Sequence, residues 1–236
     1  MTTCSSPSPL LKGSGLPDFR SIDSAQVRDE IPILLQELEA SFLELESDLE
    51  KTMATDQPLS WASVMHPLQR ISERLRWSWG VVSHLNGVCN SADLREAHAS
   101  QQPEVVRLGN RLGQSQVLHR ALTRLQTAPA EPLNESQRRI LSSELLSMNQ
   151  RGVGLQGEEQ LAFNRTSERL AELSTGFGNH VLDATQAWTL LLTENFKILR
   201  QKEEHTLEKS FLVKTKSIYT YSNFIHKIII SSKVEI

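Results

Sequence analysis

The residues best suited to metal chemistry are seven histidines, and none of them is followed by glutamate. Zinc-dependent hydrolysis on a helix needs H-E-x-x-H, because two imidazoles one turn apart grip the ion while the glutamate polarises its water. The nearest pattern runs from His205 to Lys209 and is similar to the inverted H-x-x-E-H motif, but it ends in lysine. Lysine is not an ordinary zinc ligand. We therefore interpret His205 and Glu208 as solvated helix charges rather than metal ligands, and predict no catalytic, cofactor-binding or metal-binding residue.

Other motifs favour structural interpretations. Residues 152–157 fit G-x-G-x-x-G, but a dinucleotide-binding loop must follow a strand, whereas here a helical pattern precedes it. A helix cap and turn is the better interpretation. Asn134 and Asn164 begin glycosylation sequons that fall within predicted helices, and we attribute both to chance. No G-x-S-x-G marks a nucleophilic serine.

His84 is the most conspicuous polar residue, because it follows Trp77 and Trp79 within one helical pattern. Composition alone predicts a buried or half-buried histidine that uses its ring for hydrogen bonding. The alternative is that the aromatic pair belongs to a peptide-facing surface. The sequence does not separate the two.

Apolar residues at helical spacing predict five helical regions that must position these side chains. They cover about residues 31–49 (with a possible earlier turn from Ser24), 58–88, 93–126, 134–152 and 157–192. Pro67 is expected to kink or divide the second, and Pro103 to divide the third into a short and a longer helix. Ser60 and Asn134 are predicted N-caps. Residues 219–230 fit either helix or strand. We predict an all-α antiparallel bundle, because stripes this long need partners and the connections are short.

Bulk composition narrows the class. Net charge is −3, so nothing demands nucleic acid or an anionic membrane as partner, and no apolar run predicts a membrane span. Only two cysteines occur, which argues against a disulfide framework. The amino-terminal end is Ser/Pro-rich without an apolar core typical of signal peptides. We expect a soluble cytoplasmic protein, with an organelle stroma or matrix as the alternative.

Composition changes sharply near residue 194. Lys12 and Lys51 are the only lysines before it, whereas residues 195–236 contain seven lysines and carry eight basic against four acidic residues. We predict three parts: a disordered end (1–15), a helical domain (16–194) and a divergent Lys/Ile-rich tail (195–236). The tail is interpreted either as the product of read-through, frameshift or an unspliced intron, or as a variable carboxy-terminal helix or strand.

Several runs carry a family resemblance. Residues 83–86 (S-H-L-N), 93–97 (D-L-R-E-A), 111–115 (R-L-G-Q-S) and 137–140 (Q-R-R-I) resemble the amino-terminal region of oligopeptidase A-type enzymes. The likeness is most specific in residues 173–185 (L-S-T-G-F-G-N-H-V-L-D-A-T), whose polar positions helical spacing does not require. On these residues, about 16–194 resembles the thimet oligopeptidase family of zinc metallopeptidases.

The resemblance implies a helical clamshell enzyme, much longer than this chain, that cleaves short peptides in a narrow channel. It implies zinc held by H-E-x-x-H and a downstream glutamate, neither of which can be carried over to these residues. We expect a catalytically inert helical domain that forms part of the channel wall and leaves an apolar face exposed. The alternatives are a stand-alone helical interaction or peptide-binding module, and a catalytic half supplied in trans.

Overall fold

The structure is a computed structural model that describes residues 8–188. The chain divides into two units, Met1–Thr185 and Gln186–Ile236, and the account below concerns the first. His205, Glu208 and the tail 195–236 lie outside the described residues.

The described part of the chain is all-α, as the sequence predicts. It contains one 3-10 turn, six α-helices and no strand between residues 8 and 188. The elements are η1 (Phe19–Ser21), α1 (Ser24–Ala54), α2 (Trp61–Val88), α3 (Ala92–Gly113), α4 (Gln116–Thr127), α5 (Glu135–Gln150) and α6 (Gly157–Ala187).

Side-chain caps begin most of these helices. Asp23 and Gln26 form a capping box at α1, so that helix begins at Ser24 and continues through Pro32. Ser60 caps α2, and Asn134 pairs with Gln137 at the start of α5 with both hydrogen bonds 2.9 Å long. Each cap satisfies amide groups that have no partner inside the first turn. The two caps predicted from sequence are confirmed.

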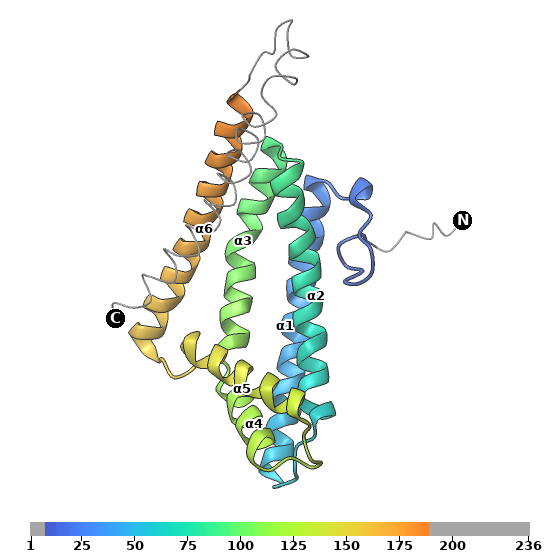
Figure 1. Cartoon of the computed structure of the whole chain (residues 1–236), viewed down its shortest axis with the longest axis vertical. Helices are drawn as coiled ribbons and strands as arrows, with labels where there is room; N and C mark the ends of the chain where they lie inside the picture. The colour runs from blue at the N-terminus through green and yellow to red at the C-terminus, as the bar shows by residue number, and fades with distance from the viewer. Residues whose placement is uncertain (1–7, 189–236) are drawn as a thin grey trace, which may run out of the picture. The chain divides into compact units, whose positions relative to one another are not determined.

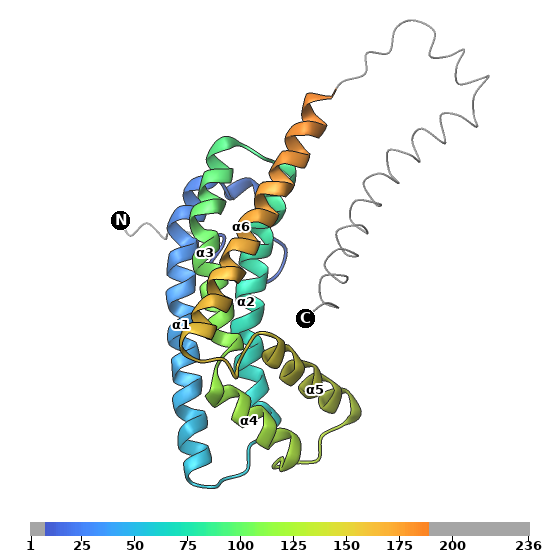
Figure 2. The same ribbon diagram turned by 90° about the vertical axis from the view of Figure 1, so that its left-hand side faces the viewer.

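Helices α1, α2 and α3 pack side by side in alternating directions, with α4 and α5 at the end of the bundle where α1 finishes (Figures 1 and 2). The predicted apolar stripe of α1 is buried throughout, and Phe42 at its centre is 0% exposed. One continuous core joins α1 to α2, α3, α4 and α5. The bundle therefore depends on α1 as its central helix.

The break in the third helical region does not lie at Pro103, and that prediction is wrong. Pro103 lies within α3, and the chain breaks instead between Gly113 and Gln116. A proline inside a helix leaves the carbonyl four residues earlier without its partner, but Ala99 is exposed, so water can satisfy that group. The break lies where Ser115 accepts a hydrogen bond from the amide of Leu118 (3.1 Å) and caps α4. Pro67 does not divide the second region either, because α2 is one helix across it.

Close packing explains why residue 113 is a glycine. A Cβ atom there would lie 2.5 Å from the Arg151 side chain. The end of α3 therefore approaches the end of α5 more closely than any larger residue allows.

Helix α6 differs from the other helices because it contributes no buried residue. It runs along the outer side of α3 (Figures 1 and 2). Long helices usually derive their stability from a packed apolar face. Polar contacts with α3, rather than a buried face, therefore hold α6 beside the bundle.

Candidate functional site

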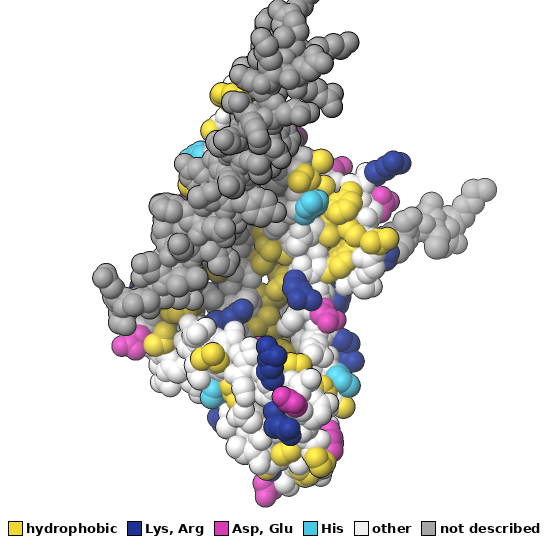
Figure 3. Space-filling view, viewed as in Figure 1, with side chains coloured by type: hydrophobic (Ala, Val, Ile, Leu, Met, Phe, Trp, Pro, Cys, Tyr) yellow, Lys and Arg dark blue, Asp and Glu magenta, His cyan; other side chains and the backbone are white. Residues whose placement is uncertain are grey.

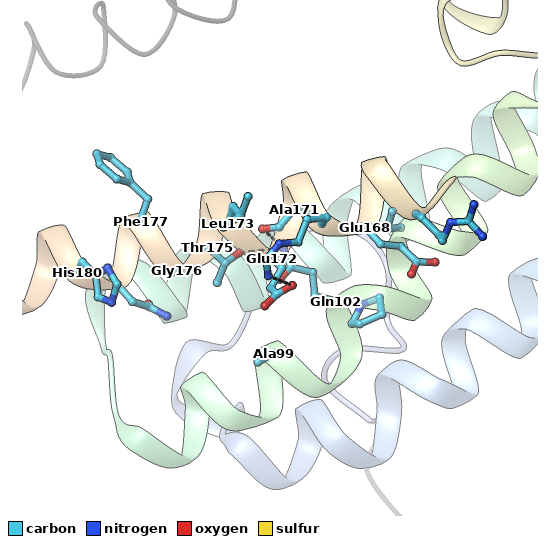
Figure 4. Close-up of a pocket in the computed structure, with 15 residues that line it drawn as sticks. Ala99, Gln102, Glu168, Ala171, Glu172, Leu173, Thr175, Gly176, Phe177 and His180 are labelled. Atoms are coloured by element: carbon cyan, nitrogen blue, oxygen red, sulfur yellow. Dashed lines mark hydrogen bonds and ion pairs between the residues drawn. The ribbon is translucent and has the colours of Figure 1, made fainter. Parts of the chain in front are cut away.

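A cavity of about 1080 Å³ lies between α3 and α6. Figure 4 shows α3 on one side, with Ala99 and Gln102, and α6 on the other, with Leu173, Thr175 and His180. Pro103 and Val106 complete the apolar wall on α3. A concave site with apolar walls and a few polar groups is typical of ligand or partner binding.

Polar contacts bridge the two helices across this cavity. Gln102 on α3 donates from Nε2 to the Ala171 carbonyl (3.1 Å) and to Thr175 Oγ1 (2.8 Å), as the dashed lines in Figure 4 mark. Arg107 Nε lies 3.2 Å from Glu168 Oε1. These three α3–α6 bonds hold the middle of α6 in position without burying it.

A charged pair fixes the far end of α6. Arg95 makes two hydrogen bonds to the Asp183 carboxylate, one of them 3.0 Å between Nη1 and Oδ2. The hydrogen bond from Arg95 lowers the pKa of Asp183 below its usual range. Both side chains are partly solvent-exposed, and exposed ion pairs contribute little to stability. The pair therefore orients α6 more than it stabilises it.

A polar corner anchors the beginning of α6. Gln114 donates to Asn164 Oδ1 (2.9 Å) and to the Arg151 carbonyl (3.0 Å), and accepts from Gln160 (3.2 Å). This side chain therefore connects the end of α3, the end of α5 and the first turns of α6. It fixes the angle at which α6 leaves the bundle.

The same corner contains a half-buried ion pair. Arg111 binds Glu46 on α1, and Ser115 also donates to that carboxylate. Burial raises the pKa of Glu46, but the hydrogen bonds and charge of Arg111 together with Ser115 lower it further, so the net pKa lies below the ordinary value. The guanidinium also lies 5.1 Å from the centre of the Phe42 ring. The run 111–115 is thus a structural junction between α1, α3 and α6.

An apolar stripe runs along α6 and is exposed, as expected from the sequence, and its members Leu173 and Phe177 also line the cavity. Leu170 is 63% exposed and Phe177 48%, with Leu173 and Val181 between and beyond them. Figure 4 shows the ring of Phe177 pointing away from α3. We call residues 170, 173, 177 and 181 the α6 stripe. Exposed apolar groups in one row mark a contact surface.

His84 is not buried, so that prediction is wrong. It lies on the exposed side of α2, and its ring faces Phe19 with the ring centres 5.5 Å apart. The two tryptophans have different partners: Trp77 donates to the Gly15 carbonyl (2.8 Å), whereas Trp79 stacks on His98 of α3 with ring centres 4.5 Å apart. His98 is only 4% exposed, and burial lowers its pKa. Its atom Nδ1 is buried without a hydrogen-bond partner.

The remaining motifs have structural roles. Gly152 ends α5 with φ +79° and Gly157 begins α6 with φ +56°, so the glycine-rich run is a link between helices, as interpreted from sequence. Positive φ favours glycine. The asparagines of both sequons are also used, Asn134 as the cap of α5 and Asn164 as a partner of Gln114.

A catalytic metal does not fit the described residues. Between residues 8 and 188, no group of three or more His, Cys, Asp or Glu side chains could hold a metal ion. No chemical step through zinc is therefore derived for this chain. In the same range, no helix is both long enough and apolar enough to cross a membrane.

No catalytic motif predicted the residues that form the cavity. The sequence signals were two runs of the family resemblance: 173–185, whose polar residues helical spacing does not require, and 93–97, which contains Arg95. Thr175 and Asp183 of that run bond to Gln102 and Arg95 on α3. Both α3 residues were missed as site residues, because single Arg and Gln side chains on a helix carry no recognisable pattern.

Curated relatives support the resemblance seen in these runs. The chain is 34% identical over 194 residues to the organellar oligopeptidase A, chloroplastic/mitochondrial, of Arabidopsis thaliana, covering 82% of this chain and 24% of that protein. It is also 34% identical to a probable cytosolic oligopeptidase A of Arabidopsis thaliana (82% and 26%). It is 30% identical over 196 residues to oligopeptidase A of Escherichia coli (83% and 28%).

The match concerns one part of those proteins. The chain spans about a quarter of the length of these relatives. The family described as the neurolysin/thimet oligopeptidase amino-terminal domain matches residues 31–160, more than half of the chain. That range runs from α1 to the first turn of α6. The chain therefore belongs to the family of neurolysin/thimet oligopeptidase amino-terminal domains.

Proposed function

We propose that this chain is the helical wall domain of an oligopeptidase A-type zinc metalloendopeptidase, and that these 236 residues alone do not hydrolyse peptides. In this proposal the domain helps to enclose short peptides, while zinc and the catalytic residues belong to the part of the relatives that this chain does not match. The sequence contains no H-E-x-x-H to supply them.

The α6 stripe is the observation that carries the proposal. It lies on a helix with no buried residue, and Leu173, Phe177 and Val181 belong to the run that most specifically resembles the family. About three quarters of each relative lies outside the match, so further chain is available in those proteins to cover such a face. The cavity beside the stripe provides groups that can contact a peptide main chain, since Gln102, Asn179 and His180 line it.

The proposal extends to the domain boundaries and the compartment. We place the wall domain at residues 16–194, supported by matches of 194–196 residues and by the division of the chain after Thr185. A cytoplasmic location, with an organelle stroma or matrix as the alternative, agrees with relatives named cytosolic and chloroplastic/mitochondrial. A catalytic half supplied in trans stays a prediction. The tail (195–236) is still interpreted either as the product of read-through, frameshift or an unspliced intron, or as a variable carboxy-terminal helix or strand.

A second candidate is a stand-alone peptide-binding module, favoured by the cavity itself. Its walls are apolar on α3 and amphipathic on α6, and that combination suits a short peptide. In this reading the chain binds peptides without any catalytic partner.

One experiment with two readouts tests both candidates. A quenched fluorogenic peptide is mixed with the purified chain, and cleavage and binding are measured with and without added zinc. The wall-domain proposal predicts no chelator-sensitive cleavage and only weak binding, because one wall of a channel offers few contacts. Oligopeptidase A of Escherichia coli serves as the positive control.

The outcomes separate the candidates. Chelator-sensitive cleavage by the chain overturns the claim that it is inert. Tight, saturable binding that Leu173→Asp abolishes, but Leu161→Asp leaves intact, favours the stand-alone module. Leu161 is a matched control, because it is an exposed leucine of α6 that does not line the cavity.

A further inference from the structure

The amino-terminal segment is packed against the bundle. Residues 1–15 were expected to be disordered, yet Leu10 is 0% exposed and belongs to the core. We call residues 8–18 the strap. In Figure 1 the strap lies beside the half of α2 that ends near Val88. The physical reason is that Leu10 finds both an apolar pocket and partners for its main chain, which composition could not reveal.

Two buried side chains bind the main chain of Leu10. Its amide donates to Glu30 Oε2 on α1 (2.8 Å), and its carbonyl accepts from Ser78 Oγ on α2 (2.7 Å). Glu30 is 7% exposed and Ser78 0%. A buried carboxylate and a buried hydroxyl are costly unless they are hydrogen-bonded, so both depend on an occupant of this position.

The rest of the strap follows α2. The indole of Trp77 donates from Nε1 to the Gly15 carbonyl (2.8 Å). Gly13 has φ +65°, and a Cβ there would lie 3.0 Å from Arg74 Cγ. Main-chain atoms therefore provide most of the polar recognition, and the side chain of Leu10 provides the apolar anchor. Residues 9–12 form a turn, in which the Leu11 amide donates to the Ser8 carbonyl (3.1 Å), so the slot holds this part of the chain as a turn.

Beyond Gly13, the remaining residues of the strap have little burial of their own. Leu16 is almost fully exposed, and Ser14, Gly15 and Asp18 are exposed as well. Figure 3 shows apolar side chains gathered over the strap and the neighbouring end of α2. The strap is therefore anchored mainly at Leu10 and Gly15 rather than packed along its whole length.

From these contacts, we propose that the slot formed by Glu30, Ser78 and the Leu10 pocket is a binding site for a leucine-containing peptide that adopts a turn. The strap of this chain is its resident occupant. A peptide of the same sequence supplied in trans competes with it. The slot lies between α1 and α2, apart from the α3–α6 cavity, so this inference is independent of the proposed function.

The test uses the full chain and a fluorescent peptide of residues 8–16 (S-P-L-L-K-G-S-G-L). In the chain carrying Leu10→Ala the resident strap is weakened, and the peptide is expected to bind saturably. Wild-type chain should bind at least about tenfold more weakly, because the tethered strap competes at a high effective concentration. The same peptide with alanine in place of its first leucine should lose about tenfold or more in affinity.

Two further measurements test the proposal if the Leu10→Ala variant does not fold. In the wild-type chain, hydrogen exchange should show the Leu10 amide protected, and millimolar strap peptide should reduce that protection. Ser78→Ala should leave the peptide concentration needed unchanged, since the strap and the competing peptide lose the same main-chain bond. Saturable binding that depends on the leucine supports the proposal. No binding to Leu10→Ala, or protection of Leu10 unchanged by peptide in the wild-type chain when the variant does not fold, overturns it.

Discussion

His98 shows how a single buried side chain couples this fold to pH. Its ring stacks on Trp79, its Nδ1 has no hydrogen-bond partner, and burial lowers its pKa from an ordinary value near 6.5. Protonation would add a charge and a donor to a buried site where Nδ1 has no hydrogen-bond partner among the described residues. The neutral ring is therefore the folded form.

The sign of the pH effect follows from this lowered pKa. Between the folded pKa and about 6.5 the unfolded chain binds more protons at this residue than the folded chain does. We predict that the free energy of unfolding contributed by His98 is fully present above that window and falls as pH decreases through it. Urea unfolding at pH 7.5 and pH 5 measures it.

Two variants isolate the contribution of His98 to the pH dependence of stability. His98→Phe keeps an aromatic ring over Trp79 and should flatten the dependence between pH 7.5 and pH 5. His66→Gln removes an exposed histidine of α2 and should leave the dependence as in the wild-type chain. An unchanged pH dependence in His98→Phe contradicts the assignment.

Residue-level prediction from sequence succeeded where local chemistry decides and failed where tertiary contacts decide. Ser60 and Asn134 were predicted as caps because their hydrogen bonds lie within three residues. His84 was expected inside and His98 was passed over, although both follow helical patterns. Packing between segments that are distant in the sequence decides which face of α2 contacts α3. The residue types along α2 do not predict that choice.

At the scale of elements, α1 and α6 have equal lengths and similar apolar stripes but opposite surroundings. The stripe of α1 is buried, whereas every residue of α6 is at least partly exposed. Apolar periodicity predicted both helices. The apolar positions between Phe163 and Trp188 have the same helical spacing as those of a buried face. Sequence pattern reports that a face is apolar; it does not report which partner is present.

A matched pair of phenylalanines tests this contrast. Phe42→Ala in α1 removes a ring that is 0% exposed and lies beneath Arg111, and should lower the free energy of unfolding by about 3–5 kcal/mol. Phe177→Ala in the α6 stripe should change it by less than about 0.5 kcal/mol. Chemical denaturation of both variants measures the difference. Comparable losses in the two would show that α6 is packed in solution.

Proline and glycine positions explain the remaining differences between prediction and structure. Pro103 was expected to divide a helical region, but the helix continues through it, and Ala99, whose carbonyl loses its partner, is an exposed residue. The real break follows Gly113, where close approach of Arg151 demands a residue without a side chain. That approach depends on the α5–α6 link and could not be inferred from the α3 sequence.

At the scale of the whole chain, the described unit is a bundle with one helix held at its side by polar contacts. Gln102, Arg107 and Arg95 connect α3 to α6 across the cavity, and Gln114 fixes the beginning of α6. The matched family covers the bundle. The relatives contain about three times as much chain outside the match as within it. We propose that this further chain covers the α6 stripe in those relatives.

Amide hydrogen exchange along the purified chain tests this assignment most directly. Helices with few buried contacts open locally at low free energy, whereas core helices exchange only through larger unfolding. We predict that amides in residues 166–183 of α6 exchange at least about a hundredfold faster than those in residues 34–45 of α1, because a long helix without a packed face is marginal in water. Protection of α6 equal to that of α1 would contradict the account.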